Sequence, residues 1–313
     1  MKYNTYVKRH TPISEIGFGA WQLGINSGWK NLEEREAIYL VEKAFDLGVN
    51  FYDTAPVYGN GTGELRLGKA LKKVNRNAVV INSKFGRLVD GTVDFNAKHI
   101  KSTIEGSLKR MGLDYLDSVI IHSPPISYLD GTKNDHYNIL ERLKEEGKIL
   151  AYGASIESCA EIDLLLTTTQ STILHAFFNI FHQNILQASS IIREKEAVVV
   201  AKIPLDSGWL TGKYTKKSVF TGVRNRWSKE EIGVRAELVN KLETIVGPDQ
   251  NLAQVALAFC LSHDLISCVI PGSISKEQLL CNVSSAEKKL SETLVKQLHN
   301  FYETEVAPLQ LPW

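Results

Sequence analysis

Four side chains that can together protonate an oxygen atom follow successive apolar runs of the sequence. Asp53 ends one such run and Tyr58 comes shortly after it, while Lys84 and His122 follow the next two runs. The phenol of a tyrosine has a pKa of about 10 in water and is a weak acid at neutral pH. A lysine ammonium beside it favours the phenolate and lowers that pKa, and an aspartate paired with the lysine keeps the ammonium charged. Because a histidine can orient a carbonyl oxygen by a hydrogen bond, the four residues predict a general acid for a carbonyl group.

Each of these residues also has an ordinary structural interpretation. A single aspartate after a strand is most often a turn or cap residue, and a single histidine is more often hydrogen-bonded structure than a catalyst. Because the four residues follow successive strands, a catalytic role is favoured over these structural roles if the strand ends meet at one place. None of the four can supply a hydride, so a cofactor must supply it. The sequence has no H-x-E or H-E-x-x-H pattern, and we predict no metal site.

Eight apolar runs alternate with segments of helical periodicity. Strands that alternate with helices form a parallel sheet, and eight such units favour an α/β fold of the closed (β/α)8 (TIM) barrel type. Barrel enzymes carry catalytic residues at the carboxyl ends of the strands, which would bring Asp53, Lys84, His122 and Ser155 to one mouth. The predicted strands are 15–19, 49–53, 78–81, 116–121, 149–153, 171–175, 197–201 and 267–270. The predicted helices are 33–47, 64–73, 98–111, 138–146, 160–167, 185–195, 231–246 and 252–261.

Two segments lie outside this repeat. Leu205–Lys229 is long for a connection between a strand and a helix, and such a loop in a compact domain is typically a functional lid. Ser291–Glu305 predicts an additional C-terminal helix. We find no linker and predict a single domain over residues 1–313. An open dinucleotide-binding sheet would need G-x-G-x-x-G after a strand, and the run from Gly17 to Gln22 lacks the third glycine.

The composition excludes several classes of protein. The 313 residues contain 36 Lys and Arg against 35 Asp and Glu, a net charge of +1, whereas a nucleic-acid binder would show a basic excess. No apolar stretch reaches the roughly 18 residues of a membrane-spanning helix. The 4 cysteines form no C-x-x-C pair, which is typical of free thiols in a reducing compartment. We therefore predict a cytoplasmic protein that binds neither nucleic acid nor membrane. The carbonyl chemistry above predicts a small-molecule substrate, and we separately expect a monomer or a small homo-oligomer.

Four segments resemble signatures of the aldo-keto reductase family, in the family's own order. Asn50–Gly59, continuing to Gly68, is similar to its D-T-A-x-x-Y-G…E-x-x-L-G signature, and Ser107–Asp117 to a second signature that precedes the histidine. Gly208–Tyr214 is similar to its G-x-L-T-G-K-Y loop, and Ile270–Ser273 to the end of its last strand. The resemblance spans nearly the whole chain. It implies a (β/α)8 barrel and an NAD(P)-dependent oxidoreductase.

The resemblance also implies roles for individual positions. Asp53, Tyr58, Lys84 and His122 match the catalytic tetrad, with Tyr58 as the acid, or as the base when an alcohol is oxidised. Trp21 matches an aromatic residue that lines the substrate pocket. The matches to the cofactor site are Ser155 and His175 at the nicotinamide carboxamide, Phe178 stacked on the nicotinamide ring, Leu205, Gly208 and Leu210 along the pyrophosphate, and Ser273, Gln278 and Asn282 around the adenosine.

The sequence departs from the family pattern at three places. Ile156 stands where an asparagine is usual and His175 where a glutamine is usual, and both amides normally hold the carboxamide. Lys or Arg is also missing from the positions that usually bind the 2′-phosphate of NADP, which are occupied by Gly272, Ile274, Ser275 and Gln278. A phosphate without a guanidinium loses its strongest contact. We expect NADP, the usual cofactor of the family, with NAD as the alternative.

Three activities are compatible with these residues. The leading hypothesis is the reduction of an aldehyde or ketone, or the oxidation of the matching alcohol. Sugars are among the substrates that this hypothesis includes. The altered carboxamide positions motivate a second hypothesis, a nucleotide-binding barrel that serves as a regulatory or structural subunit with little or no turnover. A third is a Schiff-base aldolase built on Lys84, which Asp53 opposes because the amine would have to lose its proton.

Overall fold

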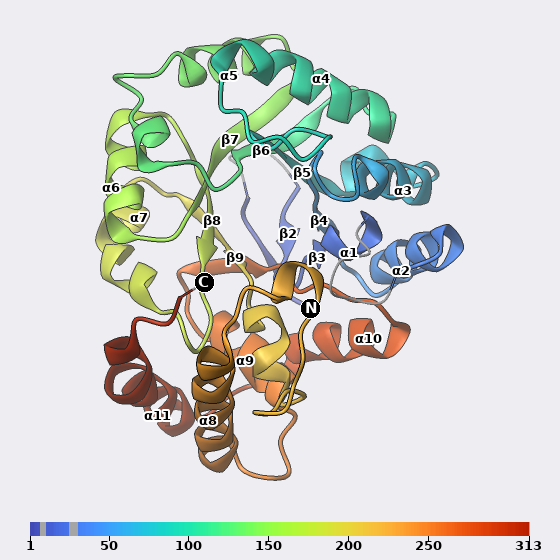
Figure 1. The fold of residues 1–313 in the computed structure, drawn as a ribbon. Coiled ribbons are helices and arrows are strands. Elements are labelled where there is room, and N and C mark those ends of the chain that lie inside the picture. Colours follow the sequence, from blue (N-terminus) through green and yellow to red (C-terminus); the bar gives the residue numbers. More distant parts are fainter. Residues whose placement is uncertain (7–10, 25–30, 313) are drawn as a thin grey trace.

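A sheet of eight parallel strands lies at the centre of the protein (Figure 1). The computed structural model describes residues 1–6, 11–24 and 31–312. Bridges between Ile16 and Val269 and between Gly19 and Gly272 join the first strand to the last, so the sheet closes into a barrel. This arrangement confirms the predicted (β/α)8 fold. In their order around the sheet, the strands are β3 (Phe18–Gly19), β4 (Phe51–Asp53), β5 (Val80–Phe85), β6 (Leu116–Ile121), β7 (Ile149–Ile156), β8 (Ile173–Phe177), β9 (Val198–Lys202) and β10 (Ile266–Val269).

Side chains of the barrel strands point alternately into the barrel and toward the helices, since successive residues of a strand face opposite sides. One apolar cluster fills the barrel interior and includes Phe51, Val80, Ile120, Ile173 and Val200. A larger cluster lies between the strands and the helices and contains the intervening side chains, such as Tyr52, Ile81, Ile121, Leu174 and Val199. The same alternation decides which residues at the strand ends face the barrel mouth.

A short hairpin near the N-terminus packs under the barrel. Its strands β1 (Tyr3–Asn4) and β2 (Ile13–Ser14) pair antiparallel. Tyr6 belongs to the interior cluster, and its Oη lies 2.5 Å from Oγ of Ser118 near the start of β6. The hairpin therefore covers the amino-terminal end of the barrel. It has no counterpart among the predicted strands, because strands this short show no periodicity.

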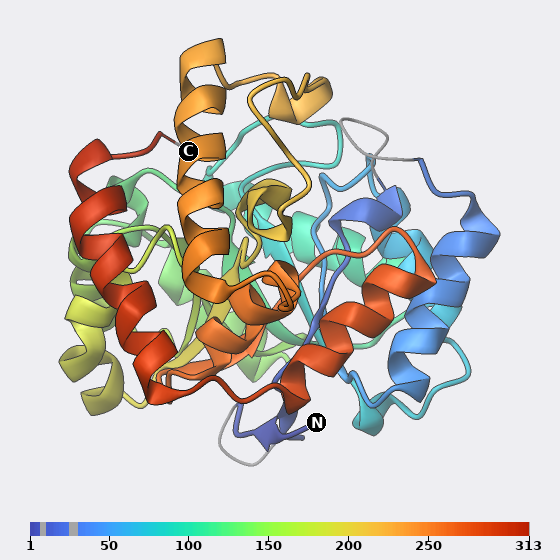
Figure 2. The ribbon, with the colours of Figure 1, turned by 90° about the horizontal axis from the view of Figure 1, so that it is seen from below.

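Helices surround the barrel (Figures 1 and 2). The apolar run 252–261 forms α9 with the predicted bounds and lies in the outer core. The predicted helix 185–195 is instead a 3₁₀ segment, Asn184–Ala188, followed by the short α7. The helices are α1 (Trp21–Gly24), α2 (Glu34–Asp46), α3 (Thr62–Leu71), α4 (Ile100–Met111), α5 (His136–Glu145), α6 (Cys159–Thr168), α7 (Ser189–Glu194), α8 (Lys229–Val246), α9 (Leu252–Leu261), α10 (Lys276–Ser284) and α11 (Glu292–Phe301).

The long connection between β9 and α8 has a small core of its own. It contains two 3₁₀ helices, Asp206–Thr211 and Gly222–Arg224. Trp209 is fully buried, and its ring centroid lies 5.5 Å from that of Phe220, which in turn lies 5.0 Å from Trp227. This aromatic cluster holds the predicted lid segment in a folded conformation.

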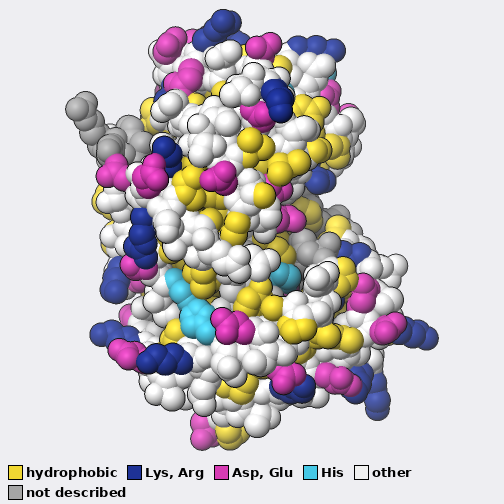
Figure 3. Space-filling model, turned by 90° about the vertical axis from the view of Figure 1, so that its left-hand side faces the viewer, with side chains coloured by type: hydrophobic (Ala, Val, Ile, Leu, Met, Phe, Trp, Pro, Cys, Tyr) yellow, Lys and Arg dark blue, Asp and Glu magenta, His cyan; other side chains and the backbone are white. Residues whose placement is uncertain are grey.

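Charged side chains of both signs are interspersed over the face shown in Figure 3, in keeping with the net charge of +1. That face therefore offers no extended basic surface to a polyanion. In the part of the chain that the structure describes, none of the helices has the length and apolar character needed to cross a membrane.

Candidate active site

A buried ion pair joins the ends of β4 and β5. Nζ of Lys84 lies 2.8 and 2.7 Å from the two carboxylate oxygens of Asp53 and donates a 2.8 Å hydrogen bond to the carbonyl oxygen of Thr54. Asn82 donates to the same carboxylate at 2.7 Å. Burial is the largest single influence and opposes the charge of Lys84, but the interactions with Asp53 and Tyr58 together outweigh it and hold the pKa of the lysine above its ordinary value. The lysine therefore stays charged, which argues against a Schiff-base nucleophile at this position.

Tyr58 lies beside this ion pair, in the turn after β4. Nζ of Lys84 is 4.9 Å from the centroid of the buried phenol ring. Burial is the largest influence on the pKa of Tyr58 and raises it, whereas the charge of Lys84 lowers it by less, so the pKa lies above its ordinary value of 10. The sequence predicts that Lys84 lowers the pKa of Tyr58, and that prediction is wrong for the net value, because burial has the larger effect. The phenol holds its proton at neutral pH, as a proton donor must.

Two further rings contact the phenol. The ring centroid of Trp21, in α1, lies 4.8 Å from that of Tyr58, and the centroid of His122 lies 5.9 Å from it, both edge-on. Burial, followed by the charge of Lys84, holds the pKa of His122 well below its ordinary 6.5. Nδ1 of His122 has no hydrogen-bond partner among the described residues. The histidine is thus neutral and retains hydrogen-bonding capacity beside Tyr58.

His175 lies deeper in the barrel, against the carboxylate of Asp53. Its Nδ1 is 3.5 Å from Oδ1 of Asp53, a distance compatible with an ion pair. Burial lowers the pKa of His175 to about 3, however, so the ring is neutral and the contact is not ionic. Neither ring nitrogen has a hydrogen-bond partner in the described part of the chain. The structure therefore places His175 with the tetrad, and its contact with a carboxamide stays a prediction.

A lysine without a role in the sequence predictions joins Ser155 at the mouth. Lys202 ends β9, and its Nζ donates to Oγ of Ser155 at 2.7 Å and lies 3.2 Å from Oε1 of Glu157. Val198 and Val200 of the same strand point into the barrel, so Lys202 lies on the interior face as well. The sequence does contain a signal for Lys202: it is a charged residue at the end of an apolar strand, two residues after the inward-pointing Val200.

Phe178 does not lie with the other residues predicted to bind the cofactor. Ile173 of β8 points into the barrel, whereas Leu174, Ala176 and Phe178 belong to the outer core. The ring of Phe178 is fully buried and stacks against Phe259 of α9, with the centroids 6.0 Å apart. The position does not support a stacking role on the nicotinamide, because alternation along the chain directs the ring toward the helices.

The backbone turns sharply after β9, where the resemblance expects the pyrophosphate. Ile203, Asp206 and Ser207 have φ values of 55°, 45° and 54°, and Gly208 has 97°. Such values are unfavourable for residues with a Cβ, above all a β-branched one, and are found mostly at functional turns. A Cβ on Gly208 would lie 2.9 Å from the ring of Tyr214. Backbone amides in turns of this kind can bind an anion, but those of Asp206, Gly208 and Leu210 already donate to carbonyl oxygens of the same segment. The contact with a pyrophosphate therefore stays a prediction.

The two leucines of this segment differ in exposure. Leu205 is half-buried, and Leu210 is fully buried within the outer core. The side chain of Leu210 therefore faces away from any ligand at the turn. The backbone N–H of Leu210 already donates to the carbonyl oxygen of Leu205 at 3.2 Å.

The predicted adenosine side lies where β10 leads into α10. Asn282 donates to Oγ of Ser273 at 3.0 Å and to the carbonyl oxygen of Gly272 at 3.3 Å. Gln278 accepts a 3.0 Å hydrogen bond from a backbone N–H of the same turn. These bonds hold the turn in front of the amino terminus of α10, a position that favours an anion. Lys276 is exposed at the first residue of that helix, and residues 271–282 contain no arginine.

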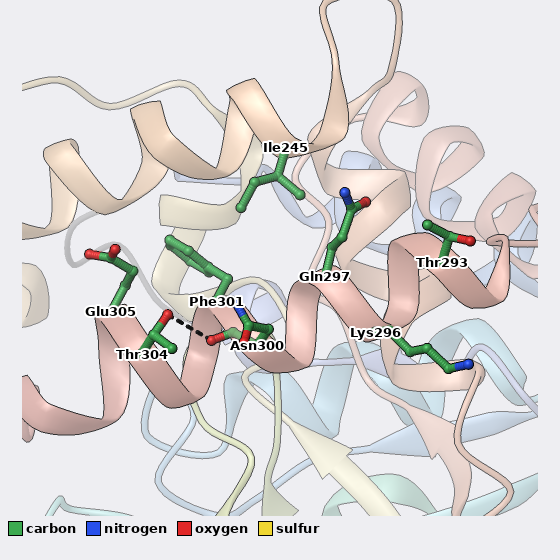
Figure 4. A pocket seen from close by; sticks show the side chains of 8 residues that line it. All are labelled: Ile245, Thr293, Lys296, Gln297, Asn300, Phe301, Thr304 and Glu305. Carbon is green, nitrogen blue, oxygen red and sulfur yellow. Dashed lines mark hydrogen bonds between the residues drawn. The ribbon is translucent and has the colours of Figure 1, made fainter.

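A groove on another part of the surface is separate from these residues (Figure 4). It lies between α8 and α11, and its volume is about 520 Å³. None of the predicted site residues lines it, so it has no part in the chemistry considered above. Its lining consists of Ile245 together with Thr293, Lys296, Gln297, Asn300, Phe301, Thr304 and Glu305.

Known proteins resemble this chain over nearly its whole length. The model of the Aldo/keto reductase family matches residues 15–303. The chain is 27% identical over 308 residues to the NADH-specific methylglyoxal reductase of Escherichia coli (strain K12), with 91% of this chain and 94% of that protein covered. It is 28% identical over 309 residues to L-galactose dehydrogenase of Arabidopsis thaliana, with 96% and 93% covered. The solved structure of aldo-keto reductase AKR11C1 from Bacillus halodurans (holo form) matches with a TM-score of 0.77 at 25% identity, over 95% of each chain. The chain therefore belongs to the aldo/keto reductase family of oxidoreductases, which act on small carbonyl compounds with a nicotinamide cofactor.

Proposed function

We propose that the protein reduces a small aldehyde or ketone, or oxidises the matching alcohol, with Tyr58 as the proton donor or acceptor. The observation that carries this proposal is the buried contact of Tyr58 with Lys84, itself paired with Asp53 at 2.7 Å. The names of two relatives refer to methylglyoxal and to L-galactose. Both are small polar compounds, and we propose that class, sugars included, as the substrate.

The tetrad divides the proton chemistry. Tyr58 donates its phenolic proton to the carbonyl oxygen as negative charge develops there. The ammonium of Lys84, kept charged by Asp53, stabilises the phenolate that remains. His122 donates a hydrogen bond from its neutral ring to the same oxygen. The nicotinamide dinucleotide supplies the hydride when it is bound.

The residues that would hold this cofactor lie on three segments. Ser155 faces the nicotinamide end, the backbone from Leu205 to Leu210 the pyrophosphate, and the turn before α10 the adenosine. In that turn a 2′-phosphate has one lysine, Lys276, and no arginine within reach of the same segment. We propose NADP, the usual cofactor of the family, and keep NAD as the alternative, which a relative named as NADH-specific supports.

Tyr58→Phe tests the proposed role, because it removes the hydroxyl and keeps the ring. We expect turnover of a panel of aldehydes with NADPH or NADH to fall by about 100-fold or more, with dinucleotide affinity unchanged. Tyr137→Phe is the matched control, since Tyr137 is equally buried at 6% exposure and its hydroxyl donates to a backbone carbonyl remote from the tetrad. Full turnover by Tyr58→Phe would refute the proposal.

The same panel separates this proposal from a regulatory or structural subunit. Consumption of the reduced dinucleotide with any aldehyde of the panel supports the reductase. Tight binding of the dinucleotide by the unmodified protein, with turnover of none of the aldehydes, would favour the subunit.

A further inference from the structure

Lys202 and Ser155 form one polar unit on the interior face of the barrel. The ammonium donates to Oγ of Ser155 at 2.7 Å, and Oγ of Ser123 lies 3.4 Å from the same hydroxyl. The side chain of Lys202 is 13% exposed, whereas that of Glu157, its carboxylate partner among the described residues, is 49% exposed. Because water screens the carboxylate more than the ammonium, part of the positive field of Lys202 remains directed into the barrel.

This field reaches the residues of the proposed reaction. The charge of Lys202 contributes to the lowered pKa of His122 and of His175. Burial is the largest influence on Lys202 and, with the charge of Lys84, lowers its pKa, while Glu157 and Glu161 raise it. Lys84 is balanced by the buried Asp53, whereas Lys202 forms its ion pair with the exposed Glu157 and is attracted to the half-buried Glu161 without contacting it within the described structure. The side of the mouth formed by β7 and β9 therefore carries the ammonium of Lys202 on its interior face, with both carboxylates toward the rim.

The neighbouring side chains leave the nicotinamide end with few polar contacts. Ile156 is fully buried in the outer core, and His175 lies against Asp53 in the interior. Ser155 remains at the mouth, and its oxygen already accepts a hydrogen bond from Lys202. The hydroxyl hydrogen of Ser155 is consequently free to point away from the ammonium, toward a ligand or toward Ser123.

We propose that Lys202 positions the nicotinamide carboxamide together with Ser155 and makes the protein bind the reduced dinucleotide more tightly than the oxidised one. The oxidised nicotinamide ring carries a positive charge that the reduced ring lacks, so a nearby ammonium raises the dissociation constant of the oxidised form selectively. This inference rests on the proposed function, because it requires a dinucleotide in the barrel mouth. It assigns to Lys202 a positioning and selective role and no step of proton transfer.

The test is the ratio of dissociation constants of the oxidised and reduced forms, measured by titration for NADP⁺ and NADPH and for NAD⁺ and NADH. We expect Lys202→Met to lower this ratio by about tenfold, which corresponds to about 1.4 kcal/mol. Lys202→Arg keeps the charge and should keep the ratio within about twofold. Glu157→Gln removes the rim carboxylate and should raise the ratio, by about threefold. Lys195→Met, at an exposed lysine beyond α7, is the matched control and should leave the ratio unchanged.

The outcomes distinguish the inference from the function on which it rests. If Lys202→Met and Glu157→Gln bind the dinucleotides with the same ratio of dissociation constants as the unmodified protein, the inference is refuted. The proposed function then still stands. An unchanged ratio together with a raised KM for a carboxylate-bearing aldehyde, but not for a neutral one, also refutes it and assigns Lys202 to the substrate. If Lys202→Met does not fold, Glu157→Gln alone decides. Failure of the unmodified protein to bind any of the four dinucleotides refutes both proposals.

Discussion

The buried pair of Asp53 and Lys84 yields a quantitative prediction about stability. In Asp53→Asn the ammonium keeps its hydrogen bond to Thr54 but loses a carboxylate at 2.7 Å, and the new amide group also faces the donor of Asn82. Two unit charges about 3 Å apart attract by about 5 kcal/mol at an effective dielectric constant of about 20. Removal of one partner from a buried pair costs about 3–5 kcal/mol in practice. We expect the free energy of unfolding at pH 7 to fall by about 3 kcal/mol or more.

The dependence of this deficit on pH has a definite sign. In the unmodified protein the pKa of Lys84 lies above its ordinary 10.5, so the stabilisation is fully present below about pH 10.5 and is lost as the pH rises through the folded value. In Asp53→Asn burial dominates, and the folded pKa of Lys84 falls below 10.5. Between that value and 10.5 the unfolded variant binds more protons than the folded one, so its stability rises by up to about 1.4 kcal/mol per pH unit. The deficit therefore narrows as the pH approaches 10.

Urea denaturation followed by tryptophan fluorescence at pH 7, 8, 9 and 10 measures this deficit. Asp46→Asn is the matched control, since its carboxylate is 65% exposed and lies 3.8 Å from Lys43. An exposed pair of this kind contributes less than about 1 kcal/mol. A deficit for Asp53→Asn below about 1 kcal/mol at pH 7, or one that stays constant up to pH 10, would show that the pair does not act as argued.

Two further predictions concern catalysis and the cofactor. Because burial keeps both His122 and His175 neutral, neither should contribute a titration step to kcat/KM between pH 6 and 8. Asp206, whose pKa burial raises to about 6, titrates separately, so a step near pH 6.5 that His122→Asn abolishes would contradict a neutral ring. NADPH should bind more tightly than NADH in a fluorescence titration, and Lys276→Met should weaken NADPH by about fivefold and leave NADH unchanged, because only NADPH carries the 2′-phosphate. A preference for NADH above tenfold in the unmodified protein would overturn the choice of NADP.

The sequence contains enough information for the barrel and for most of its mouth. The strands can be predicted because each is apolar on both faces. The tetrad can be predicted because Asp53, Lys84 and His122 end such strands or directly follow them. The tetrad residues can be placed without the register between strands, because the carboxyl ends of parallel strands all lie on the same side of the barrel.

The misassigned and missed residues depend on finer geometry. Phe178 and Lys202 both follow apolar strands, and only the alternation of neighbours such as Ile173 and Val200 separates the outward ring from the inward lysine. The pKa of Tyr58 depends on how deeply the phenol is buried, to which side chains from other segments contribute, such as Trp21 at 4.8 Å between ring centroids. Packing of this kind leaves no periodic signal along the chain.

The seam that closes the barrel has a consequence for synthesis of the protein. It joins Ile16 to Val269, so the first barrel strand emerges from the ribosome long before the strand that completes its pairing. Until β10 arrives, β3 has an open edge, which is a template for pairing with other chains. Trp21, which we propose lines the substrate pocket, follows β3 after one residue, so it is synthesised long before the barrel strand beside it gains its last partner. A nascent chain that stalls before β10 would therefore carry all four tetrad residues and still lack a closed site.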